Sequence, residues 1–243
     1  MIKISEVVRD IEKSQSAEYH RGKSWEHCYV FFRNYKKFRN DADLLDRSAL
    51  HLGFFLASWG MLRGSSFLLQ KDYKFYVPIV KTLIEPTYNG LWDFDFSKES
   101  KEQNIDNLFN LKKELEERIE ENNKADGDDK KHQMDLIITK IIMATMGCAP
   151  SYDRYFKDGL RNKMGPEKMK KGKYGNFHKN SFKNLLDLSE GDEELRKIYK
   201  ETCLIKGTIF KHPPMKLLDL YFWLSGQPQQ LVSLGGGTEA RRC

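Results

Sequence analysis

An aspartate, Asp153, follows a glycine and a proline where one apolar segment ends and an amphipathic one begins, in the stretch MGCAPSYDRYFKDGLR. Gly147 is placed to end the first helix, and Pro150 and Ser151 suit the first positions of the next. Asp153 then falls in the first turn of that helix, where unpaired backbone N–H groups and the helix dipole favour an anionic carboxylate. Such a carboxylate either stabilises the helix alone or faces a positive charge that develops during a reaction.

Trp59 and Arg63 are a second pair of candidates. They lie one helical turn apart in a segment that we expect to be one helix, from about Ala42 to Gln70. Gly60 and Gly64 fall beside them, and a glycine in a helix interior costs about 1 kcal/mol relative to alanine. Either another group approaches the backbone there or the helix breaks. Trp59 itself is either a core residue or the wall of a pocket.

A basic segment follows Arg161. The residues 161–180, RNKMGPEKMKKGKYGNFHKN, hold seven Lys or Arg and one acid, with Tyr174, Phe177 and His178 interleaved. Lysines bind phosphate by charge, and aromatic rings stack on bases. The segment is therefore expected to be either a nucleic-acid-binding loop or a disordered, solubilising one.

The elements that must position these residues are helices, because nearly every apolar pattern in the chain has helical spacing. We expect an all-α fold with two lobes in a single domain, residues 1–230, and a break between the lobes near 124–131. The residues 231–243 have no pattern that could pack, and they are expected to be a disordered tail or a cloning remnant.

Composition restricts the class of partner. The 243 residues carry a formal net charge of +6, which permits a polyanionic partner. The four cysteines are far apart and form no CxxC motif, and no apolar run approaches the roughly 18 residues of a membrane span. We therefore expect a cytoplasmic protein with no membrane association. The spacing of histidines and cysteines indicates no metal site, and no nucleotide-binding or serine-hydrolase motif indicates a cofactor.

The segment from about Leu136 to Leu160 resembles the part of the helix-hairpin-helix DNA glycosylases that carries their catalytic aspartate. The shared features are an apolar helix, a glycine, a short link, and P-x-x-D followed by a helix with a lysine and a leucine. The matching residues are Gly147, Pro150, Asp153, Lys157 and Leu160.

The same segment departs from that family at its hairpin. The family has a sequence of the type L-P-G-V-G before the apolar helix, whereas this chain has DDKKHQMD. Lys130, Lys131 and His132 would then contact phosphate by charge. Lys140 is too close to Asp153 in sequence to match the nucleophilic lysine of bifunctional members, so a monofunctional enzyme without lyase activity is expected.

The resemblance implies a monofunctional DNA glycosylase that flips a modified base out of double-stranded DNA and cleaves its N-glycosidic bond. In its overall character the chain is also similar to anti-phage glycosylases that remove glucosylated hydroxymethylcytosine. Asp153 would stabilise the oxocarbenium ion or activate water, with Trp59, Arg63 and Tyr152 near the base. No obligate protein partner is implied. The expected contacts to the DNA backbone are Lys130, Lys131, Lys163, Lys168, Lys170, Lys171 and Lys173.

Two other functions fit the residues alone. The basic segment would serve a non-enzymatic helical protein that binds DNA or RNA. The aromatic helices would equally serve a module that binds another protein. DNA binding that depends on salt separates the last function from the others, and release of a base separates the enzyme from the binding protein.

Overall fold

The computed structural model describes residues 2–35, 41–94, 100–128, 130, 132–170 and 174–228. The described residues form α-helices, short 3-10 turns and the segments that connect them. The nearest approach to a strand among them is one isolated antiparallel bridge between Leu204 and Lys211. The predicted all-α class is thus confirmed. Within the described ranges, no helix has both the length and the apolar character that crossing a bilayer requires.

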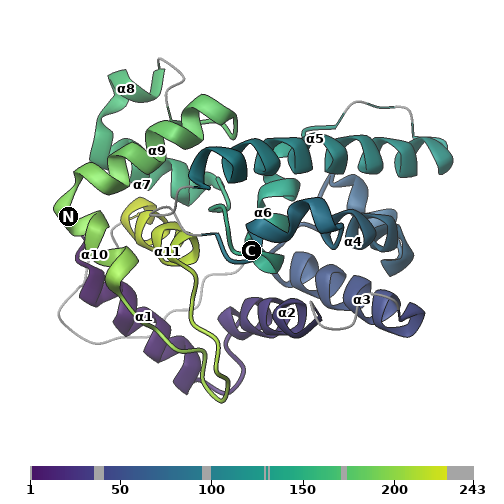
Figure 1. Ribbon diagram of the computed structural model, residues 1–243, viewed down its shortest axis with the longest axis horizontal. Coiled ribbons are helices and arrows are strands. Elements are labelled where there is room, and N and C mark those ends of the chain that lie inside the picture. The colour runs from purple at the N-terminus through teal and green to yellow at the C-terminus, as the bar shows by residue number, and fades with distance from the viewer. Residues whose placement is uncertain are drawn as a thin grey trace.

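The helices form two groups that lie side by side (Figure 1). The first group holds α2 (Gly22–Tyr35), α3 (Ala42–Ser58), α4 (Val77–Leu83), α5 (Lys101–Ala125) and α6 (Asp135–Thr145). The second group combines the N-terminal helix with the C-terminal ones: α1 (Ile4–Ser16), α7 (Arg154–Met164), α8 (Pro166–Lys170), α9 (Lys179–Gly191), α10 (Glu193–Lys200) and α11 (Pro214–Gly226). Short 3-10 turns follow α3 and α4: Phe67–Gln70, Tyr73–Tyr76 and Pro86–Leu91.

The chain crosses from the first group to the second between α6 and α7. Because α6 packs on α2 and α3, this crossing falls at 146–153 and not in the loop at 124–131. The link begins at Gly147, whose φ of +68° ends α6 as expected for a C-terminal glycine. The predicted tail at 231–243 lies outside the described residues.

The predicted helix from Ala42 to Gln70 is wrong in its second half, because α3 ends at Ser58. Gly60 and Gly64 have φ values of +74° and +58°, which a right-handed helix cannot contain. Of the two alternatives that the glycines left open, the break is the one observed. Trp59 and Arg63 therefore belong to the segment that leaves the helix, and this segment shares a cavity with Lys140 of α6 and with Asp153 and Tyr155.

The two helices α7 and α11 are in backbone contact. A Cβ atom added to Gly159 would lie 1.9 Å from the carbonyl oxygen of Phe222, and one added to Gly226 would lie 1.9 Å from that of Tyr155. A pair of helices can approach this closely only where side chains are absent. The close pairing places the last turn of α11, at Gly226, against Tyr155 in the first turn of α7.

Candidate functional site

Asp153 lies at the junction of the two helix groups as the N-cap of α7. One of its carboxylate oxygens accepts a hydrogen bond of 3.0 Å from the backbone N–H of Phe156. The residue thus begins the helix one position earlier than the predicted first turn, and it caps the N-terminus as Asp commonly does. Its second carboxylate oxygen is left to face other elements.

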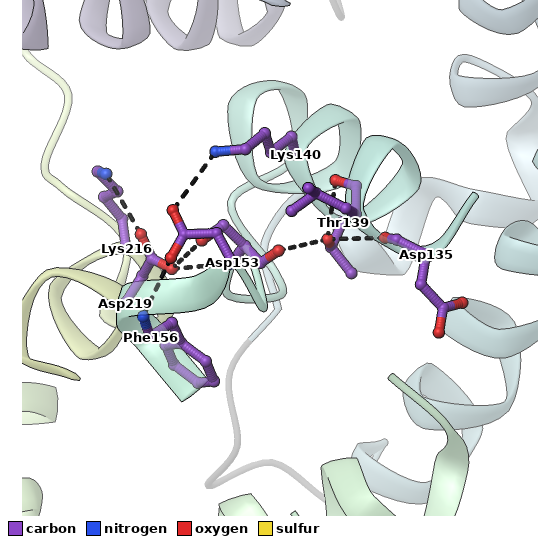
Figure 2. Close-up of polar contacts among 9 residues, drawn as sticks. Asp135, Thr139, Lys140, Asp153, Phe156, Lys216 and Asp219 are labelled. Atoms are coloured by element: carbon purple, nitrogen blue, oxygen red, sulfur yellow. Dashed lines mark hydrogen bonds and ion pairs between the residues drawn. The ribbon is translucent and has the colours of Figure 1, made fainter. Parts of the chain in front are cut away.

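Lys140 of α6 faces that second oxygen. Its Nζ lies 3.6 Å from Oδ2 of Asp153, and both side chains are largely buried, at 5% and 17% exposure (Figure 2). Sequence spacing led us to leave Lys140 out of the site. The signal that could have indicated it is that Lys140 is the one charged residue in the apolar stretch Leu136–Met146.

Asp219 of α11 holds the link that carries Asp153. Its Oδ1 accepts hydrogen bonds from the backbone N–H of Ser151, at 2.8 Å, and from the Ser151 hydroxyl, at 2.7 Å. From the other side, the Thr139 hydroxyl of α6 donates to the carbonyl oxygen of Ser151 at 2.5 Å. Ser151 is therefore fixed between both helix groups, two residues before Asp153.

A second lysine, Lys216, completes a buried set of two acids and two bases. Its Nζ lies 3.5 Å from Oδ2 of Asp219, and the two residues are 6% and 4% exposed. They are one turn apart on α11, at i and i+3, in the otherwise apolar PMKLLDLYFW. Figure 2 shows the two pairs, Lys140 with Asp153 and Lys216 with Asp219, next to one another.

Burial shifts the pKa values of Asp153 and Lys140 in opposite directions. The pKa of Asp153 is raised, first by burial and then by the negative charge of Asp219, while Lys140 acts in the opposite direction. The pKa of Lys140 is lowered by burial, which the charge of Asp153 opposes. A buried acid with a displaced pKa beside a specific charge partner is a common mark of a functional site.

The indole ring of Trp59 lies among three cationic side chains. The ring centre is 4.8 Å from the guanidinium carbon of Arg21, 5.3 Å from Nζ of Lys140 and 5.2 Å from Nζ of Lys216. Its Nε1 donates to the hydroxyl of Ser24 at 3.0 Å, which fixes the ring. Trp59 is partly exposed: it packs against the hydrophobic core and also lines the two cavities beside it.

Two cavities adjoin at this tryptophan. The Asp153 cavity, of about 590 Å³, is lined by Asp153, Lys140, Arg63 and Tyr155 among others. The Trp25 cavity, of about 240 Å³, is lined by Trp25, Glu26, His212, Lys216 and Asp219 among others. Both share the side chains of Arg21, Trp59, Trp223 and Gln227.

Of the predicted pocket residues, Arg63 lines the Asp153 cavity, where its side chain lies against Gly60. Tyr152 is different. It has a φ of +51° and is buried against Phe156 and Phe177, with its ring turned into the core of the second helix group. We therefore correct its placement, because a side chain in that packing cannot line either cavity.

The predicted phosphate contacts have separate positions. Lys130 and Lys168 are exposed. Lys163 has a 9% exposed side chain whose Nζ pairs with Asp192 at 2.7 Å, so we remove it from the proposed contacts. Three of the predicted lysines, Lys131, Lys171 and Lys173, lie outside the described residues, as does the side chain of Lys170.

The aromatic residues of the basic segment differ in exposure. Phe177 is buried, so its ring is not available for stacking on a base. His178 is exposed and is the N-cap of α9, where its ring accepts a hydrogen bond from the backbone N–H of Ser181, and Tyr174 is partly exposed. As for metals, the described residues hold no group of three or more His, Cys, Asp or Glu that could bind an ion.

Comparisons of the chain with protein-family models, curated proteins and solved structures give no match. The chemistry of the site must be argued from its own geometry. That geometry offers a desolvated carboxylate, a paired ammonium group, an aromatic wall and two adjoining cavities at the junction of an all-α fold.

Proposed function

We propose that the protein is a DNA glycosylase that hydrolyses the N-glycosidic bond of a modified base. The observation that carries the proposal is the buried carboxylate of Asp153 in a cavity walled by Trp59 and Arg63. N-glycosidic bonds break through a sugar with oxocarbenium character, and a preorganised carboxylate in a desolvated site stabilises that cation. The resemblance of Leu136–Leu160 to the aspartate segment of helix-hairpin-helix glycosylases supports the same role.

The reaction assigns a role to each part of the site. As the bond between C1′ and the base nitrogen breaks, positive charge grows on the sugar, facing Oδ2 of Asp153, the oxygen that does not cap the helix. Water then adds to C1′ and loses a proton, which ends on the departing base. Lys140 keeps the carboxylate in place and offsets part of the energetic cost of burying its charge. Asp219 positions the link between α6 and α7 through its hydrogen bonds with Ser151.

The charge around the site favours a nucleic acid as substrate. Arg21, Arg63 and Lys140 line the Asp153 cavity together with the single acid Asp153. A cavity with an excess of positive charge attracts a polyanion. An extruded base needs an aromatic surface on which to stack, and Trp59 offers one at the junction of the two cavities.

A modified base of phage DNA, such as glucosylated hydroxymethylcytosine, is the substrate that we propose to test first. Of the small residues Ser58, Gly60, Gly64, Ser65 and Ser66, the first two line the Asp153 cavity, where they would leave room for a bulky base and so support this choice. Phosphate contacts would come from Lys130, in the link between α5 and α6, since the glycine-containing hairpin of the resembled family is absent from the sequence.

The enzyme is proposed to be monofunctional, for a different reason from the short sequence separation between Lys140 and Asp153. The amine of Lys140 is near Asp153 in space, but the carboxylate pairs with it and, against the effect of burial, favours the protonated form, which is not a nucleophile. With borohydride present, we expect no covalent complex between protein and DNA. A trapped complex that is lost in Lys140→Met would instead assign lyase chemistry to Lys140.

The experiment is to incubate the protein with DNA from ordinary and from base-modified phage and to detect released base by mass spectrometry. Asp153→Asn is the inactive control. Asp158→Asn is the matched control, because Asp158 lies on the same helix and pairs with Arg161 away from the cavities. Salt-dependent DNA binding without release of any base would contradict the enzyme and favour the non-enzymatic binding protein.

A further inference from the structure

Lys216 is the second buried lysine of the site, and its ammonium group has a different environment from that of Lys140. Its Nζ lies 5.2 Å from the ring centres of both Trp25 and Trp59, so two indole faces flank the charge. Contacts of this kind are worth more when they are desolvated. These ring contacts hold the ammonium group in place, and its N–H donors can still form hydrogen bonds with other groups.

The N–H donors of Lys216 have no hydrogen-bond acceptor among the described residues. The nearest carboxylate oxygen, Oδ2 of Asp219, is 3.5 Å away. An ammonium group carries three donors, and leaving charged donors unmet in a buried place is unfavourable. Lys216 is 6% exposed and lines the Trp25 cavity, so the space that its donors face is this cavity.

The size and walls of the Trp25 cavity suit one flat ring. A cavity of about 150 Å³ already admits benzene, and this one measures about 240 Å³. Trp25, Trp59 and Trp223 give it aromatic walls. The occupant would have a planar heterocycle for these walls and an acceptor for Lys216, best a negatively charged one that stays apart from the carboxylates of Asp10, Glu26 and Asp219, which also line the cavity.

We infer that the Trp25 cavity holds the departing base and that Lys216 stabilises the negative charge on that base as the glycosidic bond breaks. The inference rests on the proposed function. When the bond breaks, both electrons stay with the base nitrogen, and the charge spreads to the ring oxygens. Lys216 donates a hydrogen bond to such an oxygen, and the base is neutralised when it takes up the proton lost by water.

The position of Lys216 agrees with this division of work. Asp153 lines the neighbouring cavity, where the sugar would lie, and Trp59 forms a wall of both cavities. The carboxylate would then act on the cationic side of the breaking bond and the ammonium group on the anionic side. Each charge is held in place before the reaction, which is the condition for electrostatic stabilisation to be effective.

The test compares two pyrimidines that differ in charge and needs no DNA. Barbiturate is an anionic pyrimidine at neutral pH, and uracil is neutral. Each is titrated into the full-length protein, with binding followed by calorimetry. Because a hydrogen bond between charged groups exceeds one to a neutral oxygen, we expect barbiturate to bind about tenfold more tightly than uracil, or more.

The variants locate the preference. Lys216→Met and Lys216→Gln should each bind barbiturate and uracil equally. Lys216→Arg should keep part of the preference for barbiturate. Lys163→Met is the matched control, because Lys163 also lies over an aromatic ring, that of Tyr221, but pairs with Asp192 outside this cavity. It should retain the full preference.

Three results would overturn the inference: no binding of barbiturate, equal binding of the two ligands by the unaltered protein, or a preference that survives in Lys216→Met and Lys216→Gln. The first two need no variant, so a variant that fails to fold does not protect the inference. Base release from DNA without a barbiturate preference would reject the role of Lys216 alone. A preference without base release would reject the glycosylase function and leave a site for anionic heterocycles.

Discussion

At the scale of single residues, Asp153 combines a structural and a chemical role that substitution can separate. Asn at this position can still accept the hydrogen bond from Phe156, but it leaves Lys140 buried without a counter-charge. We expect Asp153→Asn to release base at least about a hundredfold more slowly, because one preorganised electrostatic group supplies a few kcal/mol, and to lose about 1–3 kcal/mol of stability.

The double variant Asp153→Asn, Lys140→Met tests this separation. Removing the unpaired charge should restore most of the melting temperature without restoring base release. Melting, DNA affinity and single-turnover release are measured on the same preparations, with Asp158→Asn as control. Full activity of Asp153→Asn would contradict the proposed chemistry.

The dependence of the rate on pH is a second prediction at this scale. Base release needs the ionised carboxylate, so the rate falls as the pH drops through the pKa of Asp153. Since burial and the charge of Asp219 raise this pKa, the fall should begin at a higher pH than for an ordinary aspartate. Asp219→Asn removes one of the two causes and keeps an acceptor for Ser151, so it should move the fall to lower pH. An unmoved profile in Asp219→Asn would contradict this assignment.

Local sequence signals could predict Asp153 but not its partners. A glycine that ends one helix and an acid that begins the next can be recognised within eight residues of sequence. Gly147 ends α6 as predicted, and Asp153 is the N-cap of α7, one position before the predicted first turn. Lys140, Lys216 and Asp219 join the site only in the folded chain, where α11 packs on α7 and Lys140 of α6 pairs with Asp153 at the start of α7. The clue that remains in the sequence is a charged residue inside an apolar helix, which must find a partner when buried.

At the scale of elements, the contact between α7 and α11 sets the distance between Asp153 and Asp219. A methyl group on Gly159 would overlap the carbonyl oxygen of Phe222, so Gly159→Ala must push the helices apart. We expect a loss of about 1–3 kcal/mol or more, together with reduced base release. Gly191→Ala, at the end of α9, meets nothing within 4 Å and should leave both quantities unchanged. Equal melting of the two variants would show that the helices yield without strain.

The break after α3 shows how far an apolar pattern can mislead at this scale. The periodicity of 42–70 favoured one long helix, but Gly60 and Gly64 adopt left-handed conformations and turn the chain. The turn brings Trp59 and Arg63 to the cavity that helical spacing alone had suggested for them. The pocket prediction for Trp59 and Arg63 therefore rests on the turn after α3 and not on helical spacing, whereas Tyr152, one residue from Asp153, turns into the core.

At the scale of the whole molecule, the net charge of +6 says less than the distribution of the basic groups. Many lysines are already paired with acids, as Lys163 is with Asp192 and Lys101 with Glu190. The sequence predicts the excess of positive charge but not which lysines are paired, because their partners come from distant helices. Exposed groups such as Arg63 and Lys168 are the better candidates for phosphate contacts.

The dependence of DNA binding on salt tests this distribution. Each phosphate that a basic group neutralises adds about 0.9 to the slope of log affinity against log salt concentration. Arg63→Gln, beside Asp153, and Lys168→Gln, in the basic segment, should each flatten the slope by about that amount. Lys163→Gln should leave the slope unchanged and lower the melting temperature instead, because the ammonium group of Lys163 is ion-paired with Asp192.

The three variants remove the same charge, so any difference in slope reports the position of the charge and not the net charge. A flattening in Lys163→Gln equal to that in the other two would mean that the ion pair with Asp192 opens when DNA binds, and an unchanged slope in all three would place DNA away from both the cavity and the basic segment.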